Sequence, residues 1–198
     1  ANDAKTFFSY NKNGQVETST DALNFIESYS YSIFGDRITR TARSETAANS
    51  DRTDNVTNFV YDRRGLLVAE ILPTGSYTTQ GVVAASRVGT IYSYDARGNR
   101  VAMAEAVKLN GTESSSAIGL MFTGHSSWFA ALLAETRHTT FKYDKANRLE
   151  ESVGQARTVH SQASHLQSAT SFSPVDKIFY DTRDNVTRVD DAAGNRTI

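Results

Sequence analysis

The chain has 198 residues, of which 39% are hydrophobic and 10% aromatic, and its formal net charge is −1. This balance excludes an intrinsically disordered chain, allows one or two domains, and argues against a nucleic-acid-binding protein, which usually carries a basic surplus. Cysteine is absent, so disulfide bonds cannot hold the fold. No apolar run approaches the roughly 18 residues that a membrane-spanning helix needs.

The first elements are predicted to be short strands separated by turns. Residues 6–10 form an expected strand that ends at Tyr10, and Asn-Lys-Asn-Gly follows as a turn at 11–14. A second turn is expected at 21–24, Asp-Ala-Leu-Asn. Residues 25–31 are predicted as a strand. A short helix over 22–28 also fits locally, but the spacing of the tyrosines favours the strand.

The central part of the chain holds the most apolar strands, at 58–61 and 66–72, and the clearest turn. Leu-Pro-Thr-Gly at 72–75 is expected to be another second turn, because proline fixes a suitable φ. In the strand at 82–94, Tyr92 and Tyr94 are two residues apart and leave from the same face. Asp95 then caps a turn through its carboxylate, and Gly98 closes it at positive φ as a type I turn with a one-residue bulge. The chain therefore reverses direction at 95–98.

Residues 105–138 are the least regular part and are predicted to be an insertion. Trp128 and Leu132, like Phe129 and Leu133, are four residues apart, which favours a short helix over 127–135. Such a helix either covers an exposed sheet face or edge, or carries the only tryptophan as a binding loop. From 139 the pattern of strand and turn resumes, and 155–173 is a second polar insertion.

The strand and turn around Tyr94 recur along the chain. In five of six copies an aromatic residue lies two positions before the anchor tyrosine, which predicts an aromatic ladder on one face. The anchors are Tyr10, Tyr31, Tyr61, Tyr94, Tyr143 and Tyr180. The carboxylates predicted to cap turns are Asp62, Asp95, Asp144, Asp181 and Asp191. The predicted turn glycines are Gly14, Gly35, Gly65 and Gly98. Asn147 and Asp184 stand at the same position in the last two copies, and both residue types tolerate positive φ.

This array resembles the YD repeats of the Rhs-repeat family. The likeness is carried by Tyr-Asp-x-x-Gly at 61–65 and 94–98, and by Asp-x-x-Gly-Asn at 191–195, and it covers nearly all of residues 1–198. Departures are present: Ser32 replaces the aspartate, and the copies at Tyr143 and Tyr180 lack the glycine. The family includes Rhs toxins, the B and C components of insecticidal toxin complexes, and teneurins.

The resemblance implies an all-β fold, an antiparallel sheet of hairpins that curves or spirals into a shell. It further implies a non-enzymatic structural segment of a large bacterial protein, secreted or exposed at the cell surface, that encapsulates or displays a toxin or other cargo. We therefore expect residues 1–198 to be one repeat domain within a longer polypeptide, whose partners are neighbouring repeats. The competing hypothesis is an adhesion module that binds carbohydrate or protein through exposed aromatics, chiefly Trp128 and Tyr77.

Catalytic and metal-binding patterns are weak in this sequence. The four histidines, at 125, 138, 160 and 165, lack the spacing and the cysteine partners of a zinc site. Gly124-His125-Ser126-Ser127-Trp128 lacks the second glycine of a serine nucleophile elbow. The turn aspartates are too widely spaced for a calcium loop. We therefore predict no enzyme activity, no metal, no cofactor and no nucleic-acid partner.

Overall fold

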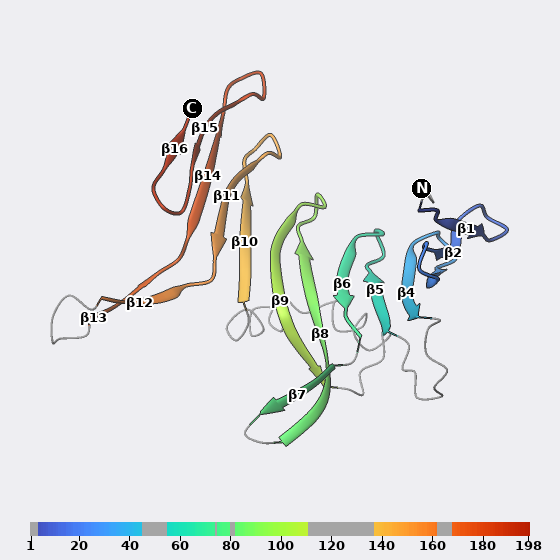
Figure 1. The fold of residues 1–198 in the computed structure, drawn as a ribbon. Coiled ribbons are helices and arrows are strands. Elements are labelled where there is room, and N and C mark those ends of the chain that lie inside the picture. The colour runs from blue at the N-terminus through green and yellow to red at the C-terminus, as the bar shows by residue number, and fades with distance from the viewer. Residues whose placement is uncertain (1–3, 45–54, 74, 80–81, 111–136, 162–167) are drawn as a thin grey trace. The chain divides into compact units, whose positions relative to one another are not determined.

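The computed structural model describes residues 4–44, 55–73, 75–79, 82–110, 137–161 and 168–198. All regular secondary structure within these ranges is β-strand (Figure 1), so the predicted all-β fold class is confirmed for them. The strands that lie next to one another in the sheets are antiparallel in every pair of known register, which is the arrangement that short turns produce.

The first eight strands carry more apolar residues than the other eight. They are β1 (Phe7–Tyr10), β2 (Val16–Thr20), β3 (Phe25–Tyr31), β4 (Arg37–Ser44), β5 (Asn55–Tyr61), β6 (Leu67–Ile71), β7 (Gly75–Thr79) and β8 (Val82–Tyr94). The other eight are β9 (Arg100–Asn110), β10 (Arg137–Tyr143), β11 (Leu149–Gly154), β12 (Arg157–Ser161), β13 (Ser168–Phe172), β14 (Val175–Tyr180), β15 (Val186–Asp190) and β16 (Arg196–Thr197).

Fourteen of these strands form one sheet, which follows the chain in the order β1 to β6, β8 to β11, and β14 to β16, with β7 paired to β8. The strands β12 and β13 form a separate hairpin. The segment 155–173, expected to be a polar insertion, is thus largely a two-stranded ribbon of its own.

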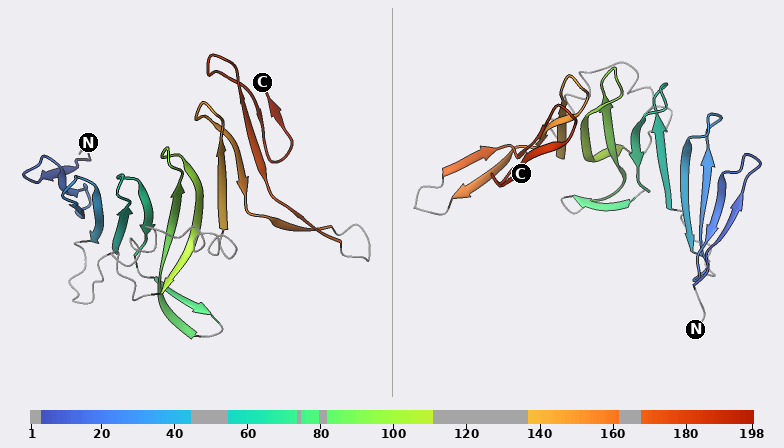
Figure 2. Two further views of the ribbon diagram at one scale, coloured as in Figure 1. Left: turned by 180° about the vertical axis from the view of Figure 1, so that it is seen from behind. Right: turned by 90° about the horizontal axis from the view of Figure 1, so that it is seen from above.

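The chain divides into two compact units, one made of residues 1–91 and 107–125, the other of 92–106 and 126–198. In the first unit the core lies on β5, β6 and the adjoining part of β8, where Ile71 and Ile91 are fully buried. These are the strands with the most apolar sequence. In the second unit, Ala102 and Ala104 of β9 are buried. Within each unit the turns of successive hairpins lie toward the same edge of the strands (Figures 1 and 2).

In five hairpins of the described ranges, the strand that follows the turn contains a one-residue bulge. The register shifts between the anchor tyrosine and the residue before it in the pairs β1/β2, β3/β4, β5/β6, β10/β11 and β14/β15. In the first hairpin the extra residue is Glu17, which lies between Val16, the partner of Tyr10, and Thr18, the partner of Ser9. This bulge lies outside the turn, whose hydrogen bonds join residues 11–15.

The prediction of a hairpin turn at 72–75 is wrong. Gly75 begins β7, and β7 pairs with β8 instead of β6. Leu72 has no side-chain oxygen to cap a turn, and its N–H donates to the Val88 carbonyl at 2.8 Å. The β6 edge therefore continues its pairing with β8 up to Leu72, where Arg87 Nε also donates to the Leu72 carbonyl.

The predicted insertion at 105–138 is partly inside the sheet. Residues 105–110 belong to β9, and 137–138 begin β10, where Arg137 pairs with Glu105. The expected helix at 127–135, including Trp128, lies outside the described residues. Tyr77 lies on β7, and only its backbone is described.

Candidate functional site: the turn edge and its contacts between hairpins

Eight turns share one backbone geometry. The N–H of the first residue donates to the carbonyl of the fifth, and the N–H of the fourth donates to the carbonyl of the first. In the turn at 95–99 these N···O distances are 2.9 Å and 3.2 Å. The first residues of the eight turns are Asn11, Asp21, Ser32, Asp62, Asp95, Asp144, Asp181 and Asp191. Six of these turns follow the anchor tyrosines, and those at 21 and 191 are the second turns expected from the sequence.

The side chain of each first residue caps its turn. The Asp95 carboxylate accepts from the backbone N–H of Arg97 and of Asn99, both at 2.9 Å, and the Asn99 amide donates to its other oxygen at 2.9 Å. These hydrogen bonds, that of the Asn99 side chain first, hold the pKa of Asp95 below its usual value. Each turn carboxylate is therefore engaged by hydrogen bonds within its own turn. Among the described residues no cluster of three or more potential metal ligands occurs.

The fourth residue of each turn has positive φ. Glycine occupies this fourth position in five turns, with φ between 75° and 94°. These residues are Gly14, Gly35, Gly65, Gly98 and Gly194. Asn24, Asn147 and Asp184 take the same conformation at 61°, 70° and 67°. Glycine pays no Cβ penalty there, and asparagine and aspartate are the other residues that enter this region most readily.

The anchor tyrosines link each hairpin to the one before it, a role that the sequence analysis missed. In four cases the hydroxyl donates to a backbone carbonyl two residues after the positive-φ residue of the turn that follows the previous anchor tyrosine. The four pairs are Tyr31 with Val16 at 2.8 Å, Tyr61 with Arg37 at 3.1 Å, Tyr143 with Arg100 at 3.1 Å, and Tyr180 with Leu149 at 2.9 Å. Tyr10, in the first hairpin, is 60% exposed, and Tyr94 ends β8.

Arginine side chains lie between the aromatic residues that precede the anchors. The Arg37 guanidinium lies 5.7 Å from the Tyr29 ring and 4.7 Å from the Phe59 ring. Arg100 lies in the same way 5.7 Å from Tyr92 and 5.0 Å from Phe141. The predicted ladder of aromatic residues is therefore interleaved with arginine at these two places, where cation–π attraction replaces direct stacking.

Side chains join three pairs of turns that follow consecutive anchor tyrosines. In each pair, the residue after the positive-φ position of the first turn donates to the second turn. Gln15 Nε2 donates to the Gly35 carbonyl at 3.2 Å, and Asn99 Nδ2 donates to Asn147 Oδ1. Arg148 donates to Asp184 Oδ1 at 2.6 Å and to the Asp181 carbonyl at 3.1 Å. Asn147 and Asp184, which replace glycine, thus supply acceptors that glycine lacks.

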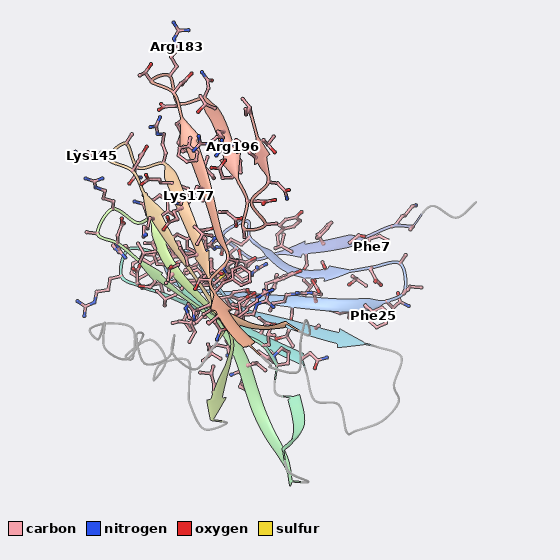
Figure 3. All side chains as sticks on the ribbon, turned by 90° about the vertical axis from the view of Figure 1, so that its left-hand side faces the viewer. Phe7, Phe25, Lys145, Lys177, Arg183 and Arg196 are labelled. Atoms are coloured by element: carbon pink, nitrogen blue, oxygen red, sulfur yellow. The ribbon has the colours of Figure 1, made fainter. Side chains whose placement is uncertain are left out.

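Two charged side chains at this edge project into solvent. Figure 3 shows Lys145 and Arg183 extending from the turns of two successive hairpins of the second unit. Both occupy central turn positions, whose side chains are not needed for the turn itself. Of the four histidines, His138 lies on β10, and the side chains of the other three are outside the described residues. Within the described ranges there is no helix long and apolar enough to cross a membrane.

No protein-family model matches the chain, and no curated protein matches it either. Solved structures are similar to it at low identity. The chain is similar to the crystal structure of TcdB2-TccC3, with a TM-score of 0.39 and 16% identity over 97% of this chain and 10% of that one. It is also similar to the complex TcdB2-TccC3-Cdc42, with a TM-score of 0.39 and 15% identity over 97% of this chain and 9% of that one.

A third similar structure is the Photorhabdus luminescens Tc holotoxin pore with the mutation TccC3-D651A, with a TM-score of 0.39 and 15% identity over 97% of this chain and 9% of that one. The chain therefore spans about a tenth of the length of each of these toxin-complex chains. A likeness of this size carries no argument about what the chain binds or does.

Proposed function

We propose that the chain is a non-enzymatic structural segment of a large, secreted or surface-exposed bacterial protein of the Rhs type, and that its hairpins form part of a β-shell around a toxin or other cargo. The observation that carries this proposal is the repeated link between hairpins. Each of four anchor tyrosines binds the backbone of the preceding hairpin at the same relative position. A linkage that repeats with the sequence can extend a sheet by any number of hairpins.

The polar residues of the turns support a structural role. The carboxylates of Asp62, Asp95, Asp144, Asp181 and Asp191 each accept two backbone hydrogen bonds within their own turn. A carboxylate that acts as a general acid or base needs access to substrate and a pKa close to neutrality. The pKa values of these five groups are instead lowered, away from neutrality.

Limited proteolysis of the natural polypeptide tests the proposal. The cargo segment, followed by mass spectrometry, should resist protease within the intact protein and be digested rapidly when it is expressed alone. The protection should disappear at the urea concentration that unfolds the hairpins. Digestion of the cargo at one rate in both settings would contradict encapsulation, and a display role would then be the surviving form of the proposal.

A second candidate is an adhesion module, favoured by large apolar side chains that remain exposed on a turn. Ile33 and Phe34 are 94% and 85% exposed. Such a module would bind carbohydrate or protein through these residues together with Trp128 and Tyr77. A glycan array, with Trp128→Ala as the control, and a tryptophan-fluorescence titration of the wild-type chain separate this candidate from the structural one. Specific, saturable glycan binding that Trp128→Ala abolishes would favour the adhesion module.

A further inference from the structure

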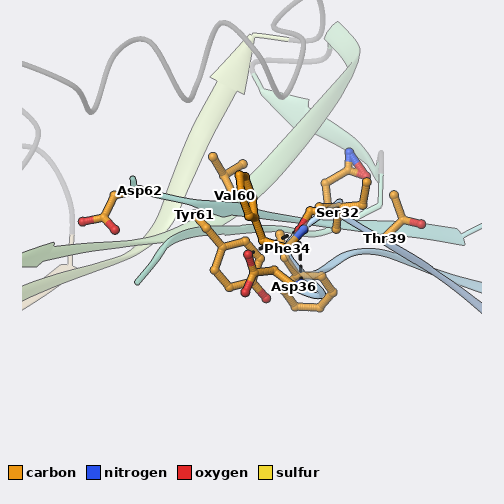
Figure 4. Close-up of a pocket in the computed structure, with 10 residues that line it drawn as sticks. Ser32, Phe34, Asp36, Thr39, Val60, Tyr61 and Asp62 are labelled. Atoms are coloured by element: carbon orange, nitrogen blue, oxygen red, sulfur yellow. Dashed lines mark hydrogen bonds between the residues drawn. The ribbon is translucent and has the colours of Figure 1, made fainter. Parts of the chain in front are cut away.

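An open hollow lies between the second and third hairpins, within the first unit (Figure 4). Its volume is 370 Å³, and it extends from the turn that begins at Ser32 to the end of β5. Phe34, Asp36 and Tyr61 are grouped on one side in Figure 4, and the Asp62 carboxylate points away from them. The wall thus combines two aromatic rings with a carboxylate, which is the chemistry that holds an organic cation.

The same place between two later hairpins is filled by an arginine of the chain itself. The Arg148 guanidinium donates to Asp144 Oδ2, to Asp184 Oδ1 and to the Asp181 carbonyl, and it lies 4.5 Å from the Tyr180 ring. Arg148 directly follows the positive-φ residue of its turn, and Tyr180 is the anchor of the next hairpin. This junction shows how a guanidinium is bound between two hairpins of this kind.

At the hollow, an acidic residue replaces that arginine. Asp36 directly follows Gly35 and is therefore the counterpart of Arg148, while Tyr61 is the counterpart of Tyr180. Gly65 replaces Asp184 and offers no side chain. A carboxylate cannot donate a hydrogen bond across the junction, as Gln15, Asn99 and Arg148 do at three other junctions. This junction therefore holds acceptors where those three hold a donor.

The negative charge in the hollow is only partly balanced. The Asp62 carboxylate is paired with Arg64 at 2.9 Å. The Arg37 guanidinium lies over the rings of Tyr29 and Phe59. The hydrogen-bond donor to the Asp36 carboxylate among the described residues is the Ser32 hydroxyl, at 3.3 Å.

One further observation places an unsatisfied acceptor on a residue that lines the hollow. Asn58 Oδ1 is buried and has no hydrogen-bond partner in the described part of the chain, although Asn58 lines the hollow. Burial, with a smaller contribution from the nearby Asp36 carboxylate, raises the pKa of Tyr61. A guanidinium carries five N–H donors in a planar fork, so one group can bond a carboxylate and a second acceptor at once.

We propose that this hollow is a binding site for an arginine side chain of a partner polypeptide segment, whose guanidinium pairs with Asp36 and lies against the Tyr61 and Phe34 rings. The occupant takes the place that Arg148 fills in the later junction. The exposed side chain of Ile33, next to Phe34 in the same turn, would contact the apolar part of the same segment. The proposal does not depend on the shell function.

The test uses the full 198-residue chain, labelled with ¹⁵N, and the capped tripeptide Ala-Arg-Ala. Amide shifts should change on titration at residues 32–39 and 58–62 and not elsewhere. The matching Ala-citrulline-Ala peptide, which has the same shape and no charge, should cause no shift. Asp36→Asn, which keeps the size of the side chain, should lower the affinity for the arginine peptide at least fivefold. Glu17→Gln, which removes an exposed carboxylate on β2, should leave the affinity unchanged.

A second variant supplies the cation from within the chain. Asp36→Arg removes the carboxylate and places a guanidinium at the position that corresponds to Arg148, so it should abolish the peptide-induced shifts. Three results would overturn the proposal: no shift in the wild-type chain, equal affinity of the wild-type and Asp36→Asn chains, or equal binding of the citrulline peptide. Equal binding of an Ala-Lys-Ala peptide would overturn the assignment of a guanidinium.

Discussion

Replacing Gly98 by alanine tests the turn that repeats through this molecule. Gly98 has φ of 89°, and its N–H donates to the Asp95 carbonyl at 3.2 Å. An L-residue with a Cβ in the left-handed region costs about 1–2 kcal/mol. Alanine also lowers the conformational entropy of the unfolded chain, which offsets about 0.4–1 kcal/mol of this destabilisation. The variant should therefore lose roughly 1 kcal/mol of unfolding free energy.

The structure separates this backbone effect from simple crowding. A Cβ added at Gly65, with φ of 77°, would meet no atom within 4 Å, so Gly65→Ala should show the same loss for a purely conformational reason. Gly89, on β8, has no positive φ, but a Cβ there would come within 2.9 Å of the Glu70 carbonyl oxygen. Gly89→Ala should therefore lose about 1–3 kcal/mol through overpacking.

Asparagine distinguishes the two causes. At position 98 it should cost less than alanine, because Asn24 and Asn147 already occupy this turn position at positive φ. At position 89 it should cost more than alanine, because the larger side chain meets the same backbone. Urea unfolding of the five single variants, followed by circular dichroism, gives the free energies. The assignment of the turn fails if Gly98→Ala has the unfolding free energy of the wild type. It also fails if Gly98→Asn is less stable than Gly98→Ala.

Two further perturbations follow from the same geometry. Hydrogen bonding, first from the Asn99 amide, lowers the pKa of Asp95 in the folded state, so its contribution to stability is present above about pH 4, near the unfolded value, and is lost as the pH falls through the folded pKa. Urea midpoints measured from pH 6 to pH 2 should therefore decrease below about pH 4, and less steeply in Asp95→Asn; a slope unchanged by that variant would contradict this. Tyr180→Phe removes the hydroxyl that donates to the Leu149 carbonyl and should cost about 0.5–1.5 kcal/mol in unfolding free energy. Tyr10→Phe is the matched control, since Tyr10 is 60% exposed, and should stay within about 0.5 kcal/mol of the wild type; equal losses would refute the link.

The turns could be predicted from the sequence because their chemistry is local. An aspartate or asparagine that caps two backbone N–H groups and a residue that accepts positive φ lie within five positions of each other, as at 95–99. The strand-to-strand antiparallel sheet then follows from the turns. The prediction at 72–75 was wrong because it relied on Pro73 and Gly75 alone, without a capping side chain at Leu72.

The contacts between hairpins could not be predicted, because they join residues far apart in sequence. Tyr143 and Arg100 are 43 positions apart. The hydrogen bond from the Tyr143 hydroxyl to the Arg100 carbonyl depends on how the strands pair, and the sequence alone does not give that register. The same applies to Asn147, which was identified as a residue that tolerates positive φ. Its second role, to accept a hydrogen bond from Asn99, becomes visible only when the two turns lie side by side.

The most direct test of the proposed function is a cryo-electron-microscopy structure of the natural polypeptide together with its cargo. The account predicts that the hairpins at 4–44, 55–73 and 137–154 form part of a continuous wall, with density for the cargo against one face of the sheet and solvent against the other. Solvent on both faces of these hairpins, with the cargo elsewhere, would contradict the role of this chain as a shell segment.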